Sequence, residues 1–505
     1  MTESPSGLDC RLTRFRVAAV ILFAAVNLAV FSVRALSIWK YGSMFSTEGG
    51  EFLMIYSVWK GTRHLPVYEW PFTFPFSISL YNYLFYESYA VFLRVIGAWD
   101  SGIQTSGRLF TSLFAVVGAL AQWRLVQSRL NLRGASNFLS LLFALGLWFS
   151  TSMVRYWALT IRPDMAAVAM VMVALAMVLR RARFGFALAG VFFYLAWSFK
   201  QSVVLALAAV CLFLLIQRRW RDLSILASVF SLLTVATLLL GTPEYRFSVL
   251  VAPRLVVGFS LSFAWFQAKP FLLENFYWIA IPIALFFPST ARRADPAFRL
   301  LMTVFVVAFM GGFLAMSKAG GAPNYFLESF VAASTLFQIA VFTAPRKLIH
   351  SLLLIGCVQP ALQLAMAPSE RSTFGTVQIA SAGEYANAVA VSDKLAQLKK
   401  PIFTTDQTFS MPWFSTGDRP QALVIDPQFH NATRLRSENG GIDGMLQRGE
   451  VPTVILNTGS DFEKVMSPRY VKTGSFLHQG VPYVQGVHYD IYSIETPARV
   501  PQGKY

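Results

Sequence analysis

Residues 77–97 read SISLYNYLFYESYAVFLRVIG, and the position of this stretch relative to a membrane decides the topology of the whole chain. The stretch is long enough to cross a bilayer, which takes about 20 mostly apolar residues. It also carries Glu87, Arg94 and several tyrosines and phenylalanines, a composition typical of a helix that lies along the membrane surface. If the stretch crossed the membrane, every segment after it would change sides.

The basic clusters that follow decide between these two positions. RRAR at 180–183 and QRRWR at 217–221 each separate two apolar runs. Clusters of this kind stay on the cytoplasmic side of membrane proteins. They do so here if 77–97 lies on the surface and the N-terminus, with its own arginines, is cytoplasmic. About eleven spans are then predicted, at 17–38, 107–126, 136–152, 165–179, 184–198, 202–216, 223–241, 271–288, 298–316, 326–343 and 348–366.

The composition agrees with an integral membrane protein, which we expect in the inner membrane of a bacterium among membrane lipids. Of the 505 residues, 55% are hydrophobic and 14% are charged, against roughly 25% charged residues in soluble domains. The net charge of +17 comes from short clusters between apolar runs, so we expect no nucleic-acid binding. The three cysteines form neither a metal pattern nor a disulfide framework.

The sequence predicts two domains. Residues 1–367 form a transmembrane domain, whose first outer loop (40–104) carries interfacial helices at about 49–60 and within 77–97. Residues 368–505 are more polar, and the strand-like stretches PIFTTD, QALVID, PTVILN and YDIYSIE alternate with helical ones. This alternation predicts a small α/β domain. The topology places that domain outside the membrane, on the periplasmic side.

Charged and polar side chains gather where the predicted chain emerges on the periplasmic side. Ionisable groups at the edge of the hydrocarbon are costly unless they are paired or functional. The positive-inside rule also disfavours cations in short outer loops. An anion bound at this face would account for them. The residues concerned are Glu48, Glu51, Lys60, Arg63, His64, Tyr68, Arg155, Arg162, Asp164, Lys200, Gln201, Lys318, Asn324, Tyr325 and Glu328.

Each of these residues, taken alone, has a purely structural explanation. Glu48 and Glu51 suit the first turn of a surface helix, where the helix dipole favours carboxylates. Pro163 and Asp164 suit the start of a helix, and Lys200 is long enough to reach a lipid phosphate. The convergence of four loops that carry both signs of charge is more informative than any single residue.

This set of side chains suits the transfer of a sugar from a lipid-linked phosphate. A carboxylate can take the proton from an acceptor hydroxyl as that hydroxyl attacks C1 of the sugar. The leaving group is an anionic phosphate, whose developing charge lysine and arginine side chains stabilise. An apolar groove between helices would hold the lipid tail. The sequence has no Gly-rich phosphate loop after a strand, so a nucleotide fold is not expected.

The order of the short motifs is similar to that in the GT-C superfamily of integral-membrane glycosyltransferases. The resemblance is strongest to the branch of protein O-mannosyltransferases and lipid A aminoarabinose transferases, and it covers roughly residues 10–366. The motifs are STEGGEF (46–52), WKGTRHLPVY (59–68), IRPDMAAVAM (161–170), FKQS (199–202) and GGAPNYFLE (320–328).

The resemblance implies a polyprenyl-phosphate sugar donor, inversion at the anomeric carbon and a catalytic carboxylate on the first outer loop. In this chain the base is Glu48 or Glu51, and its distance from the following WKG favours Glu48. The family most often has Asp at this position. Asp164 would orient the donor or acceptor. The resemblance implies neither a metal ion nor another cofactor. Its candidates for the donor phosphate are Arg155, Arg162, Lys200 and Lys318.

Two other functions fit part of the pattern. A transporter or flippase of lipid-linked sugars would also bind phosphate with cationic loops, but transporters usually place polar groups near mid-membrane in repeated halves. A structural membrane subunit could instead leave all activity to residues 368–505. The sequence leaves open whether the acceptor of a transferase would be a lipid, a glycan or a protein.

Overall fold

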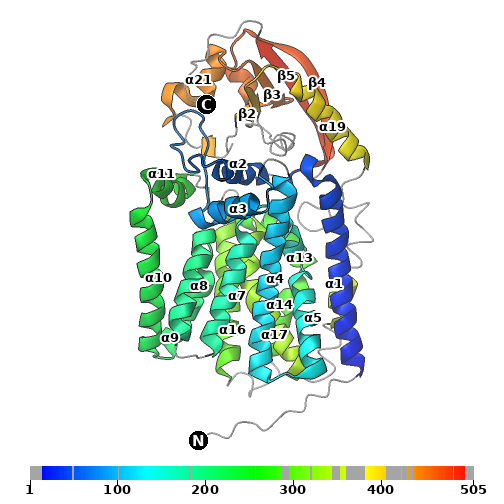
Figure 1. The fold of residues 1–505 in the computed structure, drawn as a ribbon, viewed down its shortest axis with the longest axis vertical. Helices are drawn as coiled ribbons and strands as arrows, with labels where there is room; N and C mark the ends of the chain where they lie inside the picture. The colour runs from blue at the N-terminus through cyan, green and yellow to red at the C-terminus, as the bar shows by residue number, and fades with distance from the viewer. Residues whose placement is uncertain are drawn as a thin grey trace, which may run out of the picture.

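The computed structural model describes residues 14–47, 50–99, 102–180, 184–255, 258–286, 295–318, 321–343, 353–359, 382–404, 422–423, 429–430, 436–480 and 483–494. These residues form a bundle of helices that carries a smaller domain with a β-sheet at one end (Figure 1). Residues 40–104, here called loop 40–104, lie between the bundle and this domain (Figure 1). We call this end of the molecule the loop end of the bundle.

Among the described residues, five helices are long and apolar enough to cross a membrane: α1, α4, α10, α16, and α17 together with η3. The predicted number of eleven spans stays a prediction, and the eleventh, 348–366, is described only over 353–359. The bundle helices are α1 (Arg14–Tyr41), α4 (Ile103–Leu130), α5 (Gly134–Trp148), α7 (Asp164–Arg180), α8 (Gly185–Phe199), α9 (Leu205–Ile216), α10 (Trp220–Leu240), α13 (Leu261–Glu274), α14 (Phe276–Phe286), α16 (Pro296–Met316) and α17 (Leu327–Thr343). Short elements connect them: η1 (Gly42–Met44), α6 (Ser152–Trp157), α11 (Pro243–Arg246), the π-helix η2 (Phe247–Val251), α12 (Ala252–Leu255) and η3 (Pro323–Phe326).

The burial of the helices separates the centre of the bundle from its rim. Most side chains of α7 are buried, and its many alanines allow close packing against α4 and α8. Most of α17 is buried as well. In α10, by contrast, Leu226 is the one buried residue, and apolar side chains such as Leu232 and Leu239 are exposed. An apolar helix with an exposed surface of this kind fits a lipid environment.

Hydrogen bonds between side chains tie three helices together inside the bundle. Gln122 of α4 donates to Oε1 of Gln338 on α17 at 2.8 Å, and Trp148 of α5 donates to Oε1 of Gln122 at 3.0 Å. A Cβ on Gly118 would lie 2.0 Å from the Trp148 ring, so glycine is needed there to admit the indole. Hydrogen bonds of this type help to fix how helices pack in the absence of water.

The stretch 77–97 contains α3 (Tyr83–Val95), a helix of 13 residues. That length is too short to cross a bilayer, which takes about 20 residues, and α3 lies across the end of the bundle rather than along it (Figure 1). The helix expected at 49–60 forms as α2 (Glu51–Thr62), which lies beside α3 (Figure 1). Both helices form where the sequence predicted them, and their placement at a membrane surface stays a prediction.

The smaller domain contains a five-stranded sheet of order β2-β1-β3-β5-β4. Strand β1 is parallel to β2 and β3, and the pairs β3–β5 and β5–β4 are antiparallel. The four predicted strand stretches correspond to β1, β2, β3 and part of β5, whereas β4 was not predicted. The elements are α19 (Ala382–Ala396), β1 (Ile402–Thr404), β2 (Ala422–Leu423), η6 (Glu438–Gly440), α21 (Gly441–Arg448), β3 (Thr453–Asn457), η7 (Asp461–Val465), β4 (Tyr470–Gly480) and β5 (Tyr483–Ile494).

The smaller domain packs directly on loop 40–104. Phe76 lies in the same apolar core as Phe403 of β1 and Ile442 of α21. The backbone N–H of Glu438 donates to the carbonyl of Phe72 at 2.9 Å. The domain therefore covers loop 40–104 on the side away from the bundle.

Candidate active site

A buried ion pair anchors the acidic segment at the start of α2. Glu51 is the first residue of that helix and has no exposed surface. Arg108 of α4 donates to its two carboxylate oxygens at 2.9 and 2.6 Å. The backbone N–H groups of Thr47 and Ile161 donate to the same carboxylate at 2.7 and 2.9 Å. Four hydrogen bonds from three chain segments therefore converge on this one side chain, and we call these residues the Glu51 group.

Arg108 also binds the backbone of the segment between α1 and α2. Its Nη1 and Nη2 donate to the carbonyls of Gly42 and Phe45 at 2.6 and 2.7 Å. A Cβ on Gly42 would lie 2.6 Å from Nη1, so the close approach requires glycine. Sequence reasoning missed Arg108. The available signal was an ionisable residue at the edge of the predicted span 107–126, where such a residue is costly unless paired.

Glu51 is expected to be ionised in the folded protein. Burial by itself would raise the pKa of its carboxyl, but the Arg108 guanidinium and the two backbone N–H donors outweigh burial and hold that pKa below its ordinary value of 4.5. Charge-assisted bonds of this kind are stronger than bonds between neutral groups. The carboxylate of Glu51 is thus held in place in its ionised form.

This ion pair makes stability sensitive to acid. Because the pKa of Glu51 is lower in the folded than in the unfolded state, its contribution is fully present above the ordinary value of 4.5 and is lost as pH falls through the folded pKa. Melting temperature should therefore fall more steeply in acid for the wild type than for Glu51→Gln, which has no carboxyl to protonate here. Equal slopes in a differential scanning series from neutral pH into acid would contradict this assignment.

A second cluster, the Asp164 group, lies at the start of α7. Lys200, just after α8, donates to Oδ1 of Asp164 at 2.5 Å, and Asn324 of η3 donates to the same oxygen at 2.7 Å. Arg162 donates to Oδ2 at 3.2 Å. Asp164 is 1% exposed and Lys200 is 4% exposed. Three predicted turns thus meet at one buried carboxylate that binds two cations. The charge of Glu328 also acts on Lys200.

Aromatic rings surround the two cations of the Asp164 group. The Arg162 guanidinium lies 4.6 Å from the centre of the Trp157 ring, and the Lys200 ammonium lies 5.3 Å from that of Tyr325. The Tyr81 ring lies within 6 Å of both charges, at 5.6 and 5.9 Å. Rings placed in this way stabilise cations that have left water. Tyr81 was not predicted as a site residue.

The two clusters are adjacent because one short segment belongs to both. Ile161 donates its backbone N–H to Glu51, while Arg162 and Asp164 form the second cluster. Thr160 accepts a hydrogen bond from the hydroxyl of Thr47 at 2.9 Å. Residues 160–164 therefore connect the acidic segment before α2 to the paired cations.

Most other predicted residues of loop 40–104 bind within the loop. Lys60 pairs with Glu69 at 2.8 Å, and the Tyr68 hydroxyl donates to the carbonyl of Tyr81 at 2.7 Å. Arg63 lies over the Trp99 ring at 4.6 Å. His64 contacts Arg94 at the exposed surface. Glu48 lies outside the described residues.

The predicted residues on the later turns have separate contacts. Gln201 donates to the carbonyl of Leu80 at 2.6 Å. Glu328 accepts from the backbone N–H of Ala206 at 2.7 Å and so caps the start of α9. Lys318 donates to the carbonyl of Pro253. Arg155 is buried on α6, next to Tyr156.

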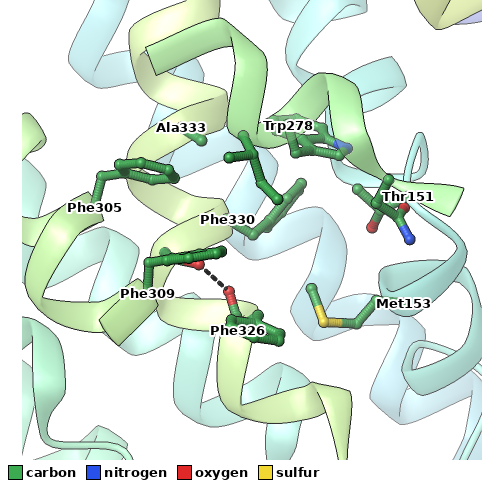
Figure 2. Close-up of a pocket in the computed structure, with 11 residues that line it drawn as sticks. Thr151, Met153, Trp278, Phe305, Phe309, Phe326, Phe330 and Ala333 are labelled. Atoms are coloured by element: carbon green, nitrogen blue, oxygen red, sulfur yellow. Dashed lines mark hydrogen bonds between the residues drawn. The ribbon is translucent and has the colours of Figure 1, made fainter. Parts of the chain in front are cut away.

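A small apolar pocket of about 20 Å³ lies between α6, α14, α16 and α17. Figure 2 shows the rings of Phe305, Phe309, Phe330 and Trp278 around it. Phe326 of η3 also lines the pocket, and Asn324 on the same turn donates to Asp164. The pocket and the Asp164 group are thus connected through one short helical turn.

Among the residues that the structure describes, no three His, Cys, Asp or Glu side chains gather to hold a metal ion. The absence of a metal stays a prediction.

Comparison with known proteins bears on the fold. No protein-family model and no curated protein matches the sequence. The structure is similar to ArnT from Cupriavidus metallidurans bound to undecaprenyl phosphate, with a TM-score of 0.59 and 14% identity over 94% of this chain and 97% of that one. It is also similar to the apo state of that protein, with a TM-score of 0.59 and 13% identity over 92% and 97% of the two chains. ArnT is a lipid A aminoarabinose transferase of the GT-C superfamily. The chain therefore shares the overall fold of ArnT, a protein of the family that the order of its motifs resembles.

Proposed function

We propose that this protein is a membrane glycosyltransferase that moves a sugar from a polyprenyl-phosphate donor to an acceptor hydroxyl, with inversion at the anomeric carbon. The observation that carries the proposal is the Asp164 group, in which buried Lys200 and partly buried Arg162 bind one carboxylate. The group lies beside the acidic segment before α2, and its member Asn324 shares the turn η3 with Phe326, which lines an apolar pocket. The GT-C fold supports it, and ArnT has been solved with undecaprenyl phosphate bound.

Lys200 is the proposed ligand of the donor phosphate, with Arg162 beside it. An ammonium has three N–H groups, and Asp164 is the one acceptor that Lys200 has among the described residues. Asp164 holds the cation in place, and the remaining N–H groups of the ammonium can bind the oxygens of an anion. The Oδ1 atom of Asn324 is buried without a donor in the described part of the chain, and a sugar hydroxyl would supply one.

The apolar pocket is the proposed site for the start of the polyprenyl tail. Its lining is almost wholly aromatic and aliphatic, as ligand pockets for apolar groups are. Because Phe326 lines it two residues after Asn324, a lipid with its tail there would bring its phosphate towards the Asp164 group.

Glu48 is the proposed general base, and Glu51 is the anchor that positions the segment carrying it. The four hydrogen bonds to Glu51 occupy its carboxylate, which disfavours Glu51 as a proton acceptor. In the proposed reaction the acceptor oxygen forms a bond to C1, the bond from C1 to the phosphate oxygen breaks, and Glu48 takes the hydroxyl proton. The electrons of the broken bond remain on the phosphate, next to Lys200 and Arg162.

The proposed setting is the inner membrane of a bacterium, with the loop end and residues 368–505 on the periplasmic side. The basic clusters between the spans support this orientation. The acceptor would be a lipid, glycan or protein hydroxyl that reaches the loop end. Residues 1–367 would form the catalytic domain.

Proteoliposomes with a radiolabelled polyprenyl-phosphate sugar test the proposal. We expect the label to move into a new glycosidic product, with release of unsubstituted polyprenyl phosphate, when an extract of the source membrane supplies acceptors. Movement of intact donor across the bilayer with no glycosidic product would contradict the proposal and favour a transporter.

The pocket assignment predicts a selective effect of Ala333→Leu. Ala333 lines the pocket, so the larger side chain would fill it, and the melting temperature is measured alongside to check that the fold is retained. Because it shortens the space for the tail, KM for a long-chain donor should rise about tenfold or more, with less effect on a short-chain donor. Ala332→Leu is the matched control, since Ala332 is buried but does not line the pocket. Equal effects on long-chain and short-chain donors would contradict the tail assignment.

A further inference from the structure

Arg34 of α1 is a buried cation that the proposed reaction does not use. Arg34 is only 2% exposed, and its Nε and Nη2 atoms have no hydrogen-bond partner in the described part of the chain. The guanidinium lies over the Tyr156 ring, 4.9 Å from the ring centre. An uncompensated charge inside a protein costs several kcal/mol. A buried guanidinium with two N–H groups that lack an acceptor therefore requires an explanation.

The charges near Arg34 add to this cost. The cations whose charge acts on it are Arg155 and Arg108, and the carboxylate is Glu51. That carboxylate is already bound by Arg108 at 2.6 Å. Three arginines against one glutamate leave a net charge of +2 around this part of α1, α4 and α6. The surroundings therefore favour an added anion.

The unpartnered atoms of Arg34 have the geometry of an oxyanion ligand. Nε and Nη2 lie on one edge of the guanidinium and point their N–H bonds in parallel, which suits two oxygens of a phosphate or carboxylate. The guanidinium lies over the Tyr156 ring, while Nε and Nη2 are buried and have no hydrogen-bond partner in the described part of the chain. An ionisable residue within a candidate membrane span commonly marks a functional site.

We propose that Arg34, with Arg155 beside it, binds the phosphate group of a ligand at a site separate from the Asp164 group. The charges that act on Arg34 include those of Arg108 and Glu51, which belong to the Glu51 group. The shared chemistry is a phosphate oxyanion, which a lipid headgroup or dissolved phosphate can supply. The site does not depend on the proposed transferase reaction.

Binding measurements on the full-length protein in nanodiscs test the proposal. Melting temperature is measured with and without inorganic phosphate at constant ionic strength, in phosphatidylcholine discs. The variants are Arg34→Met, which keeps bulk but removes charge, and Arg34→Lys, which keeps charge but removes the paired donors. The control is Arg16→Met, because Arg16 is a buried arginine near the opposite end of the same helix.

We expect a phosphate-dependent rise in melting temperature in the wild type and in Arg16→Met, and its loss in Arg34→Met. Phosphate affinity should be about tenfold to a hundredfold lower in Arg34→Met, with Arg34→Lys in between. Discs that contain phosphatidylglycerol distinguish the sources. If a lipid headgroup fills the site, these discs raise the melting temperature without added phosphate and abolish the further response to it. If dissolved phosphate fills it, the response to phosphate persists in both kinds of disc.

Two results would overturn the proposal. The first is a phosphate-dependent rise in melting temperature that is as large in Arg34→Met as in the wild type. If Arg34→Met does not fold, the same comparison is made with Arg34→Lys. The other is a loss of farnesyl phosphate binding in the Arg34 variant as large as that in Lys200→Gln, because Arg34 would then belong to the donor site. Failure of the transferase proposal alone leaves the phosphate response unchanged, so the two proposals fail separately.

Discussion

Glu48→Gln should lower the rate of sugar transfer by about 10²- to 10⁴-fold, the usual contribution of a general base, while melting temperature stays at the wild-type value. The amide keeps the size of the side chain but cannot take a proton. The measurement is the initial rate of glycosidic product formation in proteoliposomes, together with the melting temperature of the same preparation.

Glu51→Gln provides the matched comparison, three residues along the same segment. It removes the charge that compensates Arg108, and breaking one side of a buried ion pair costs about 3–5 kcal/mol. We therefore expect a clear loss of stability, and any activity that remains should follow the amount of folded protein. The double variant Glu51→Leu/Arg108→Met should lose less stability than the two single variants combined, because it leaves no buried charge unpaired.

The comparison assigns the roles of the two glutamates. Wild-type transfer in a stable Glu48→Gln protein would show that Glu48 is not the base. A stable Glu51→Gln protein that has lost transfer would reverse the two assignments. The prediction rests on the four hydrogen bonds that the Glu51 carboxylate accepts.

Lys200→Gln should lower kcat/KM for the lipid donor by about 10²- to 10³-fold, as removal of one group that stabilises developing charge does elsewhere. The ammonium is buried, has one described acceptor in Asp164 and faces the rings of Tyr81 and Tyr325. The affinity for farnesyl phosphate should fall as well, because its phosphate stands in for the leaving group of the donor.

Lys60→Gln is the matched control for Lys200→Gln. Lys60 is also a buried lysine paired with a carboxylate, at 2.8 Å from Glu69, but that pair lies within loop 40–104. Its loss should lower stability with little effect on donor affinity. If both lysine variants weaken farnesyl phosphate binding equally, or neither does, the assignment of Lys200 to the phosphate is wrong.

Much of the Asp164 group could be predicted from the sequence because its members stand in short polar breaks between apolar runs. IRPD supplies Arg162 and Asp164, FKQS supplies Lys200, and GGAPNYFLE supplies Asn324. The charge rule placed these breaks at one face of a membrane, and the structure brings the four side chains together. Their catalytic roles stay predictions.

The Glu51 group could not be predicted in the same way. A glutamate in the first turn of an interfacial helix is expected to face water, whereas Glu51 is fully buried against Arg108, 57 residues away in the chain. Pairing over such a distance leaves no pattern in a single sequence. Arg34 was missed for a related reason, since it lies inside the apolar run of α1 and has its aromatic neighbour on α6.

The number of membrane spans stays a prediction, although helices form in most of the predicted runs. Several predicted spans form helices shorter than the thickness of a bilayer requires, such as α5, α8 and α9. Hydropathy marks where an apolar run lies, but it does not fix how much of the run is helical. Strand β4 was missed because YVKTGSFLHQG lacks a regular alternation of apolar and polar residues.

The most direct test is an experimental structure of the protein with undecaprenyl phosphate bound. We expect the phosphate to lie within hydrogen-bond distance of Lys200 and Arg162. We expect the first isoprene units to lie in the pocket lined by Phe305, Phe309 and Trp278. A phosphate bound away from both cations, or a tail outside this pocket, would contradict the proposed donor site.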